Sequence, residues 1–140
     1  MQIPRTPLLR ALVLTLLCGA CSIGKGKEDA VKAVDRFHAQ YARQQFDSIY
    51  AAADKDLKQT TTHAEFVRFM SAVHRKLGPI EETKPVGWNV QRQTNGSFVV
   101  LNYETEFARG PGTESFTWRI REGVPRLQTY NVNSPALVVD

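Results

Sequence analysis

The hydrophobic pattern of the chain changes once, near Gly78 and Pro79, and this change limits the folds that the chain can adopt. Before it, apolar residues recur every three or four positions, which is typical of helices that bury one face. After Pro85, apolar and polar residues alternate, which is typical of strands with one buried face. The order of the two patterns predicts an α+β domain, with N-terminal helices packed on one face of an antiparallel sheet.

Three helices are expected before Gly78. The first covers about residues 27–44, and the second carries the apolar positions of residues 46–57. The third begins with Thr62 and Glu65, a capping box in which each side chain accepts a hydrogen bond from the backbone N–H of the other residue. Glycine followed by proline then ends the third helix.

Four strands are expected after Pro85, joined in chain order as a meander. Asn95 and Gly96 form the strongest short signal for a hairpin turn, between the first two strands. Further turns are expected at residues 110–112 and 122–123. Pro125 is expected at the start of the last strand, because proline cannot donate a hydrogen bond inside a sheet.

The second strand carries an unbroken apolar run, residues 98–101, where a half-buried strand would alternate. If one set of side chains faces the helices, Phe98 and Val100 lie on the outer face of the sheet. An outer apolar patch is typical of an interface with a partner protein or a second copy of the chain. The alternative is that the C-terminal segment, residues 134–140, covers it.

Three aromatic side chains are expected to face the helices, as core residues or as the lining of a pocket. They are Trp88, Tyr103 and Trp118.

The first 20 residues are typical of a secretory signal. Arg5 and Arg10 precede a segment that is almost purely apolar over residues 11–18. This segment is much shorter than the roughly 20 apolar residues that a membrane-spanning helix needs. We therefore expect a cleaved signal over residues 1–20, a lipidated cysteine with a flexible basic tether over residues 21–27, and one domain over residues 28–140.

The sequence Gly19-Ala20-Cys21 resembles the lipobox of bacterial lipoproteins, although Cys18 stands where those boxes usually carry leucine. The resemblance implies cleavage before Cys21 and attachment of lipid to its thiol, which would hold the protein permanently on a membrane. Ser22 after the cysteine implies sorting to the outer membrane, facing the periplasm. The alternative is a soluble secreted protein cut near Ala20.

Cysteine and charge content exclude several kinds of site. Cys18 leaves with the signal and Cys21 would carry lipid, so the folded part has no cysteine for a disulfide, a metal or nucleophilic catalysis. The chain has 18 Lys and Arg against 14 Asp and Glu, and two of the arginines lie in the signal. A nearly neutral domain without a basic stripe is not expected to bind nucleic acid.

A set of strand residues resembles an uncharacterised family of small bacterial envelope proteins, domain of unknown function 4019. The residues are Tyr103, Thr105, Phe107, Glu114, Phe116, Trp118, Arg119 and Tyr130. The resemblance covers about residues 30–132 and implies a relation to the nuclear transport factor 2-like, or cystatin-like, superfamily. That relation implies a cone, in which a curved four-stranded sheet wraps around a long N-terminal helix. The family implies no catalytic residues, and Val124-Pro125-Arg126 departs from the aromatic residue expected before the last strand.

The open end of such a cone can hold a small ligand. His38 lies beside the apolar stripe of the first helix, with Asp35 and Tyr41 as its expected neighbours, and these are the weak candidates for acid–base catalysis. The alternative for His38 is a hydrogen-bonded residue at the boundary of the core. We expect no metal or cofactor, because His63 and His74 stand too far apart on one helix to share a metal ion.

These observations favour a non-catalytic lipoprotein on the periplasmic side of the outer membrane that binds another envelope protein or a small apolar ligand. Its expected partners are the membrane, through the lipid on Cys21, and an envelope protein or a second copy, through Phe98 and Val100. One alternative is an enzyme with acid–base chemistry near His38. Another is an inhibitor or immunity lipoprotein that neutralises a periplasmic toxin.

Overall fold

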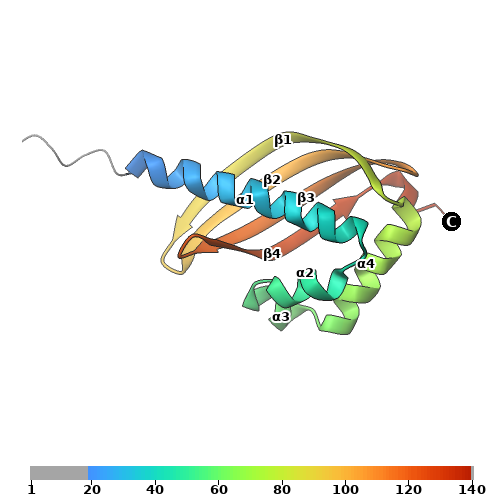
Figure 1. Cartoon of the computed structure of the whole chain (residues 1–140), viewed down its shortest axis with the longest axis horizontal. Coiled ribbons are helices and arrows are strands. Elements are labelled where there is room, and N and C mark those ends of the chain that lie inside the picture. The colour runs from blue at the N-terminus through green and yellow to red at the C-terminus, as the bar shows by residue number, and fades with distance from the viewer. Residues whose placement is uncertain (1–18, 140) are drawn as a thin grey trace, which may run out of the picture.

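The computed structural model describes residues 19–139 of the 140, with side chains from residue 24 onward. Helices come first and strands follow, which confirms the predicted α+β class (Figure 1). The helices are α1 (Gly19–Ala42), α2 (Phe46–Ala52), α3 (Lys55–Thr60) and α4 (His63–Leu77), and the strands are β1 (Ile80–Gln93), β2 (Gly96–Phe107), β3 (Gly110–Arg121) and β4 (Val124–Asn133). A short 3₁₀ helix, η1 (Pro135–Leu137), ends the described chain.

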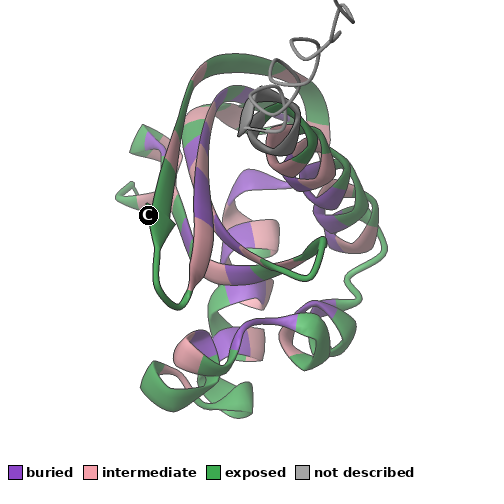
Figure 2. Ribbon diagram, turned by 90° about the vertical axis from the view of Figure 1, so that its left-hand side faces the viewer, coloured by how far each residue is buried: buried purple, intermediate pink, exposed green. Residues whose placement is uncertain are grey.

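The strands form one antiparallel sheet in the order β1-β2-β3-β4, as the predicted meander requires. The sheet curves around α1, so that its concave face and the helix enclose most of the core (Figure 2). Alternation along each strand supplies that core, because every second side chain points to the concave face. Its largest fully buried side chains include Phe37 and Tyr41 of α1, Phe116 of β3 and Met70 of α4.

The second predicted helix is in fact two helices, α2 and α3. The backbone is extended at Ala53 and Asp54, and the side chain of Asp54 accepts a hydrogen bond from the N–H of Asp56 as the N-cap of α3. The N–H of Asp54 donates to the carbonyl of Leu127 on β4, 2.8 Å away. The apolar spacing did not indicate the break, because Ala53 and Leu57 are buried on both sides of it.

Helix α1 begins at Gly19 rather than near residue 27, so the backbone over residues 21–27 is helical here. The lipidated cysteine and tether expected over those residues stay a prediction. A helix already held by packing extends at little cost, because each added residue contributes one backbone hydrogen bond without a new nucleation step. The expected signal segment lies outside the described residues, apart from Gly19 and Ala20. Among the helices within residues 19–139, none is both long enough and apolar enough to span a membrane.

The predicted helix boundaries around α4 are confirmed. Thr62 and Glu65 form the capping box, and Gly78 ends the helix with a φ of 77°, a conformation that favours glycine. Strand β1 then begins at Ile80, earlier than expected, and contains Pro85. An edge strand tolerates proline, and the pairing with β2 shifts register directly after it.

Trp88 was expected in the core or in the lining of a pocket, but its side chain is 55% exposed. Trp88 is paired with the buried Leu101, so its side chain points to the concave face of the sheet, as expected. However, β1 is an edge strand, and the first part of α1 covers Trp88 incompletely. There the ammonium of Lys27 lies 4.3 Å from the centre of the indole ring. Tyr103 and Trp118 are buried in the core, as predicted.

The C-terminal segment lies against α4 and the start of β3. The hydroxyl of Ser134 donates to the carbonyl of Pro111, 2.7 Å away, and the ammonium of Lys76 donates to the carbonyl of Leu137. The described part of this segment, residues 134–139, therefore packs at one end of the sheet. The turn that precedes Phe98 lies at the opposite end.

We predict that Phe116→Ala lowers the free energy of unfolding by about 3–5 kcal/mol, as removal of a buried aromatic ring does. The ring is fully buried and lies 5.0 Å from that of Phe37 and 5.1 Å from that of Tyr130, centre to centre. Urea denaturation followed by circular dichroism measures the loss. The matched control is Phe69→Ala, because that ring is 43% exposed, and its loss should stay below about 1 kcal/mol. Equal losses in the two variants would contradict this description of the core.

Candidate functional site

The most unusual group in the core is the carboxylate of Glu114 on β3, whose side chain has no exposed surface. Alternation along β3 places it on the concave face together with Phe116 and Trp118, between α1 and the sheet. A buried carboxylate is strongly destabilising unless its oxygens accept hydrogen bonds or pair with a positive charge. The residues around Glu114 must therefore supply donors.

Three side chains supply these donors. The hydroxyl of Thr105 on β2 donates to Oε2 of Glu114 at 2.7 Å, and the hydroxyl of Tyr130 on β4 donates to Oε1 at 2.8 Å. Nε2 of His38 on α1 lies 2.9 Å from Oε2. We call these four residues the Glu114 cluster, and it connects α1 to three strands of the sheet.

Aromatic rings surround the cluster. The imidazole of His38 meets the rings of Phe116 and Tyr103 edge to face, at 5.6 and 6.1 Å between ring centres. Burial raises the pKa of the Tyr130 phenol well above its usual value, and the nearby charge of Glu114 raises it further. The side chain of His38 is 14% exposed, so the cluster approaches solvent at this residue.

The structure brings only one of the three predicted acid–base residues to this site. His38 belongs to the Glu114 cluster, as the alternative of a hydrogen-bonded boundary residue expects. Tyr41 is fully buried elsewhere in the core, where its hydroxyl donates to the carbonyl of Gly78 at 2.9 Å. Asp35 is exposed, and its charge reaches the region only as a secondary cause of the raised pKa of Tyr103.

Of the two expected interface residues, Phe98 offers little surface. It is 7% exposed, and the guanidinium of Arg119 lies 5.0 Å from the centre of its ring. Its role in an interface stays a prediction. The C-terminal segment, the other expected cover, packs elsewhere. Val100 is half-buried, and its role in an interface stays a prediction.

Arg119 is itself held by a second polar cluster. Its Nη1 donates to Oδ1 of Asp54 at 3.0 Å, and its Nη2 donates to Asp56. The hydrogen bond to Arg119 is the main cause that holds the pKa of the Asp56 carboxyl below its usual value. This ion cluster fastens the junction of α2 and α3 to the sheet.

Sequence reasoning missed Glu114, Thr105 and Tyr130 as partners of His38. A signal was present for two of them, because Glu114 shares strand parity with Phe116 and Thr105 shares it with Tyr103. A charged residue at a core-facing position requires a partner. The partner on α1 could not be identified without the packing of the helix on the sheet.

The arrangement favours a structural role for these groups. Both oxygens of Glu114 already accept hydrogen bonds, so the carboxylate is not poised to take a proton from a ligand. The aromatic core fills the space between α1 and the sheet. Two surface hollows in the described part of the chain lie at opposite ends of the sheet, away from the Glu114 cluster. Within residues 19–139, no group of three or more His, Cys, Asp or Glu side chains is arranged to hold a metal ion.

Two comparisons bear on this chain. The model of one protein family, described as "Protein of unknown function (DUF4019)", matches residues 33–130. This range includes the whole Glu114 cluster and the ion cluster of Arg119. No curated protein matches the chain.

We predict that Glu114→Gln lowers the free energy of unfolding by about 1–3 kcal/mol. The amide keeps the shape of the side chain but replaces one acceptor by an NH₂ donor, so at least one buried donor loses its acceptor. Urea denaturation measures the effect. Glu104→Gln on the exposed side of β2 is the control and should change stability by less than about 0.5 kcal/mol. If both variants were equally stable, the cluster would not contribute to folding.

We also predict that the protein loses stability as the pH rises above about 10, the usual pKa of tyrosine. Burial raises the pKa values of Tyr41, Tyr103 and Tyr130, so these phenols stay neutral in the folded state while the unfolded chain ionises. Their contribution is complete below the unfolded pKa and is lost as the pH rises towards the folded values. Melting temperature and phenolate absorbance, followed together, should change together. Ionisation of all three phenols near pH 10 in a protein that stays folded would contradict the prediction.

Proposed function

The chain belongs to the DUF4019 family of proteins of unknown function, and on that premise we propose that it is a lipoprotein of the bacterial cell envelope with a non-catalytic binding domain. The lipid is attached to Cys21, and the domain faces the periplasm from the outer membrane. Its partner is another protein of the envelope.

One observation carries the proposal. Gly19-Ala20-Cys21 follows an apolar segment directly and is followed by a single folded domain. Cleavage before Cys21 would leave the cysteine as the first residue of the mature protein, at the start of α1. A lipid on that residue would connect the membrane to the domain through one continuous helix.

The Glu114 cluster supports binding over catalysis. An acid–base enzyme needs a titratable group within hydrogen-bond reach of a substrate. Here the carboxylate of Glu114 and Nε2 of His38 are paired with each other, under aromatic rings that fill the space a substrate would need. The cluster instead holds α1 on the sheet and gives the domain a rigid surface.

The curvature of the sheet around α1 supports a relation to the nuclear transport factor 2-like cone (Figure 2). In this proposal the interior of the cone is packed, and partners bind to its outside. Two surfaces are available among the described residues. One is the outer face of the sheet at Val100, and the other is the open edge of β1, where Val86 is 50% exposed.

We predict that Cys21→Ser abolishes incorporation of labelled palmitate and releases the protein from the membrane fraction, because serine has no thiol for the lipid. Metabolic labelling followed by membrane fractionation measures both. Cys18→Leu is the matched control, since it also removes a cysteine but places leucine where lipoboxes usually carry it, so labelling should persist. Label that persists on the Cys21→Ser protein would rule out the proposed anchor.

A further inference from the structure

The β1–β2 and β3–β4 turns lie at the same end of the domain as the start of α1 (Figure 1). The two turns are joined there, because Nε of Arg121 at the end of β3 donates to the carbonyl of Asn95 in the β1–β2 turn, at 3.1 Å. Cys21 lies in the first turns of α1. A membrane that holds Cys21, as the proposed function requires, therefore lies next to this end.

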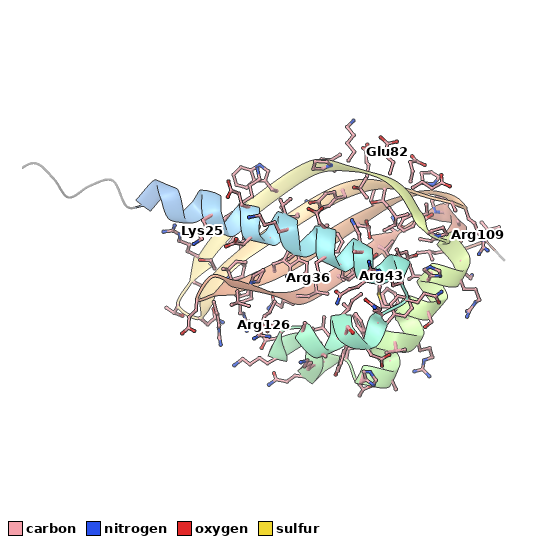
Figure 3. The ribbon with its side chains drawn as sticks, in the orientation of Figure 1. Lys25, Arg36, Arg43, Glu82, Arg109 and Arg126 are labelled. Carbon is pink, nitrogen blue, oxygen red and sulfur yellow. The ribbon has the colours of Figure 1, made fainter. Side chains whose placement is uncertain are left out.

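This end carries most of the positive side chains of the sheet and of the start of α1. We call it the basic end, formed by Lys25, Lys27, Arg92, Arg121 and Arg126. Its acidic residues are Glu28, Asp29 and Glu122, so positive charge is in excess. At the other end, the first half of β1 and the second half of β2 carry Glu81, Glu82, Glu104 and Glu106. Lys84, Arg109 and the last turn of α4, with Arg75 and Lys76, balance these four glutamates. Figure 3 shows Lys25 and Arg126 towards one end and Glu82 towards the other.

Trp88 adds an apolar group beside the basic end. Its ring is 55% exposed and lies under the ammonium of Lys27. Tryptophan beside lysine suits the boundary between lipid headgroups and acyl chains, where the ring is apolar and its N–H stays hydrated. Val124, in the first position of β4, is 48% exposed and adds a second apolar side chain next to the β3–β4 turn.

An open hollow of about 590 Å³ lies between the two turns. Arg92 and Arg121 line it together with Asn95, Ser97 and Glu122. Guanidinium groups bind phosphate through charge-assisted hydrogen bonds, and amide and hydroxyl groups can complete such a site. Arg121 also donates to Asn95 and Glu122 brings one carboxylate, so the lining keeps a net positive charge that favours an anion.

We propose that the basic end binds anionic phospholipid in the membrane that holds the lipid anchor, and this proposal rests on the proposed function. Charge complementarity selects this occupant, because an anionic surface attracts the net positive basic end more strongly than the far end, where the charges balance. The interaction acts over about 8–10 Å at physiological ionic strength, which limits it to groups at the membrane surface. The domain then lies with the start of α1, Trp88 at the edge of β1 and the two hairpin turns against the headgroups, and it leaves the far half of β1 and β2 open to a protein partner.

The test uses the full lipidated protein in vesicles of phosphatidylcholine, with or without phosphatidylglycerol. Trp88 is a built-in reporter once Trp118, which is 5% exposed, is replaced by phenylalanine. We expect phosphatidylglycerol to lower acrylamide quenching of Trp88 by at least about twofold, and brominated lipid to quench it in the same vesicles. If Trp118→Phe fails to fold, the parent protein serves instead, because acrylamide hardly reaches a buried indole.

Two matched double variants separate the basic end from net charge. Arg121→Gln with Arg126→Gln should restore quenching to the value in phosphatidylcholine alone. Arg36→Gln on α1 with Arg43→Gln directly after it, both exposed, should leave the protection in place. Equal quenching of Trp88 in both kinds of vesicle, or equal effects of the two double variants, would overturn the proposal. Failure of the proposed function gives a different result, because protein without an anchor does not float with phosphatidylcholine vesicles at all.

Discussion

The fold depends on one buried carboxylate. Glu114 has no exposed side-chain surface, and its two oxygens accept from Thr105 and Tyr130 while Oε2 lies within hydrogen-bond distance of His38. These partners come from β2, β4 and α1, so one group fixes the helix against three strands. Because a buried carboxylate without donors is strongly destabilising, loss of any element would leave it unsatisfied and would weaken the others. Cooperation between helix and sheet follows from this constraint.

Contacts on both faces of the sheet add to the link that Glu114 makes between α1 and the strands. Phe37, Phe116 and Tyr130 exclude water around Glu114, and their rings meet at 4.7–5.1 Å between centres. The side chain of Arg119 on β3 points to the outer face of the sheet, as that of Thr117 does. It lies over the ring of Phe98 and binds Asp54 and Asp56. The short helices α2 and α3 are thereby fastened to β3, and the N–H of Asp54 adds a hydrogen bond to Leu127 on the edge strand β4. The interior side chains are engaged in packing, so the ends and edges of the sheet are the surfaces open to a partner.

The class of fold was predictable from sequence because local patterns carry it. Alternation after Pro85, the turn at Asn95-Gly96 and the capping box at Thr62 each act through neighbours in the chain. Contacts between distant residues were not predictable. The break at Asp54 depends on Leu127, the burial of Phe98 depends on Arg119, and the exposure of Trp88 depends on its place in an edge strand. The same limit applies to the site, where His38 was found and Glu114 was missed.

Native-state hydrogen exchange tests most directly whether the Glu114 cluster makes α1 and the sheet one cooperative unit. The account predicts that amides of α1 from Ala30 to Tyr41 and amides of β3 around Glu114 exchange only through global unfolding, with the same free energy of opening. Their dependence on denaturant should also be the same. If the amides of α1 exchanged through a smaller opening while β3 stayed protected, the helix would be a separate unit and the central role of Glu114 would be wrong.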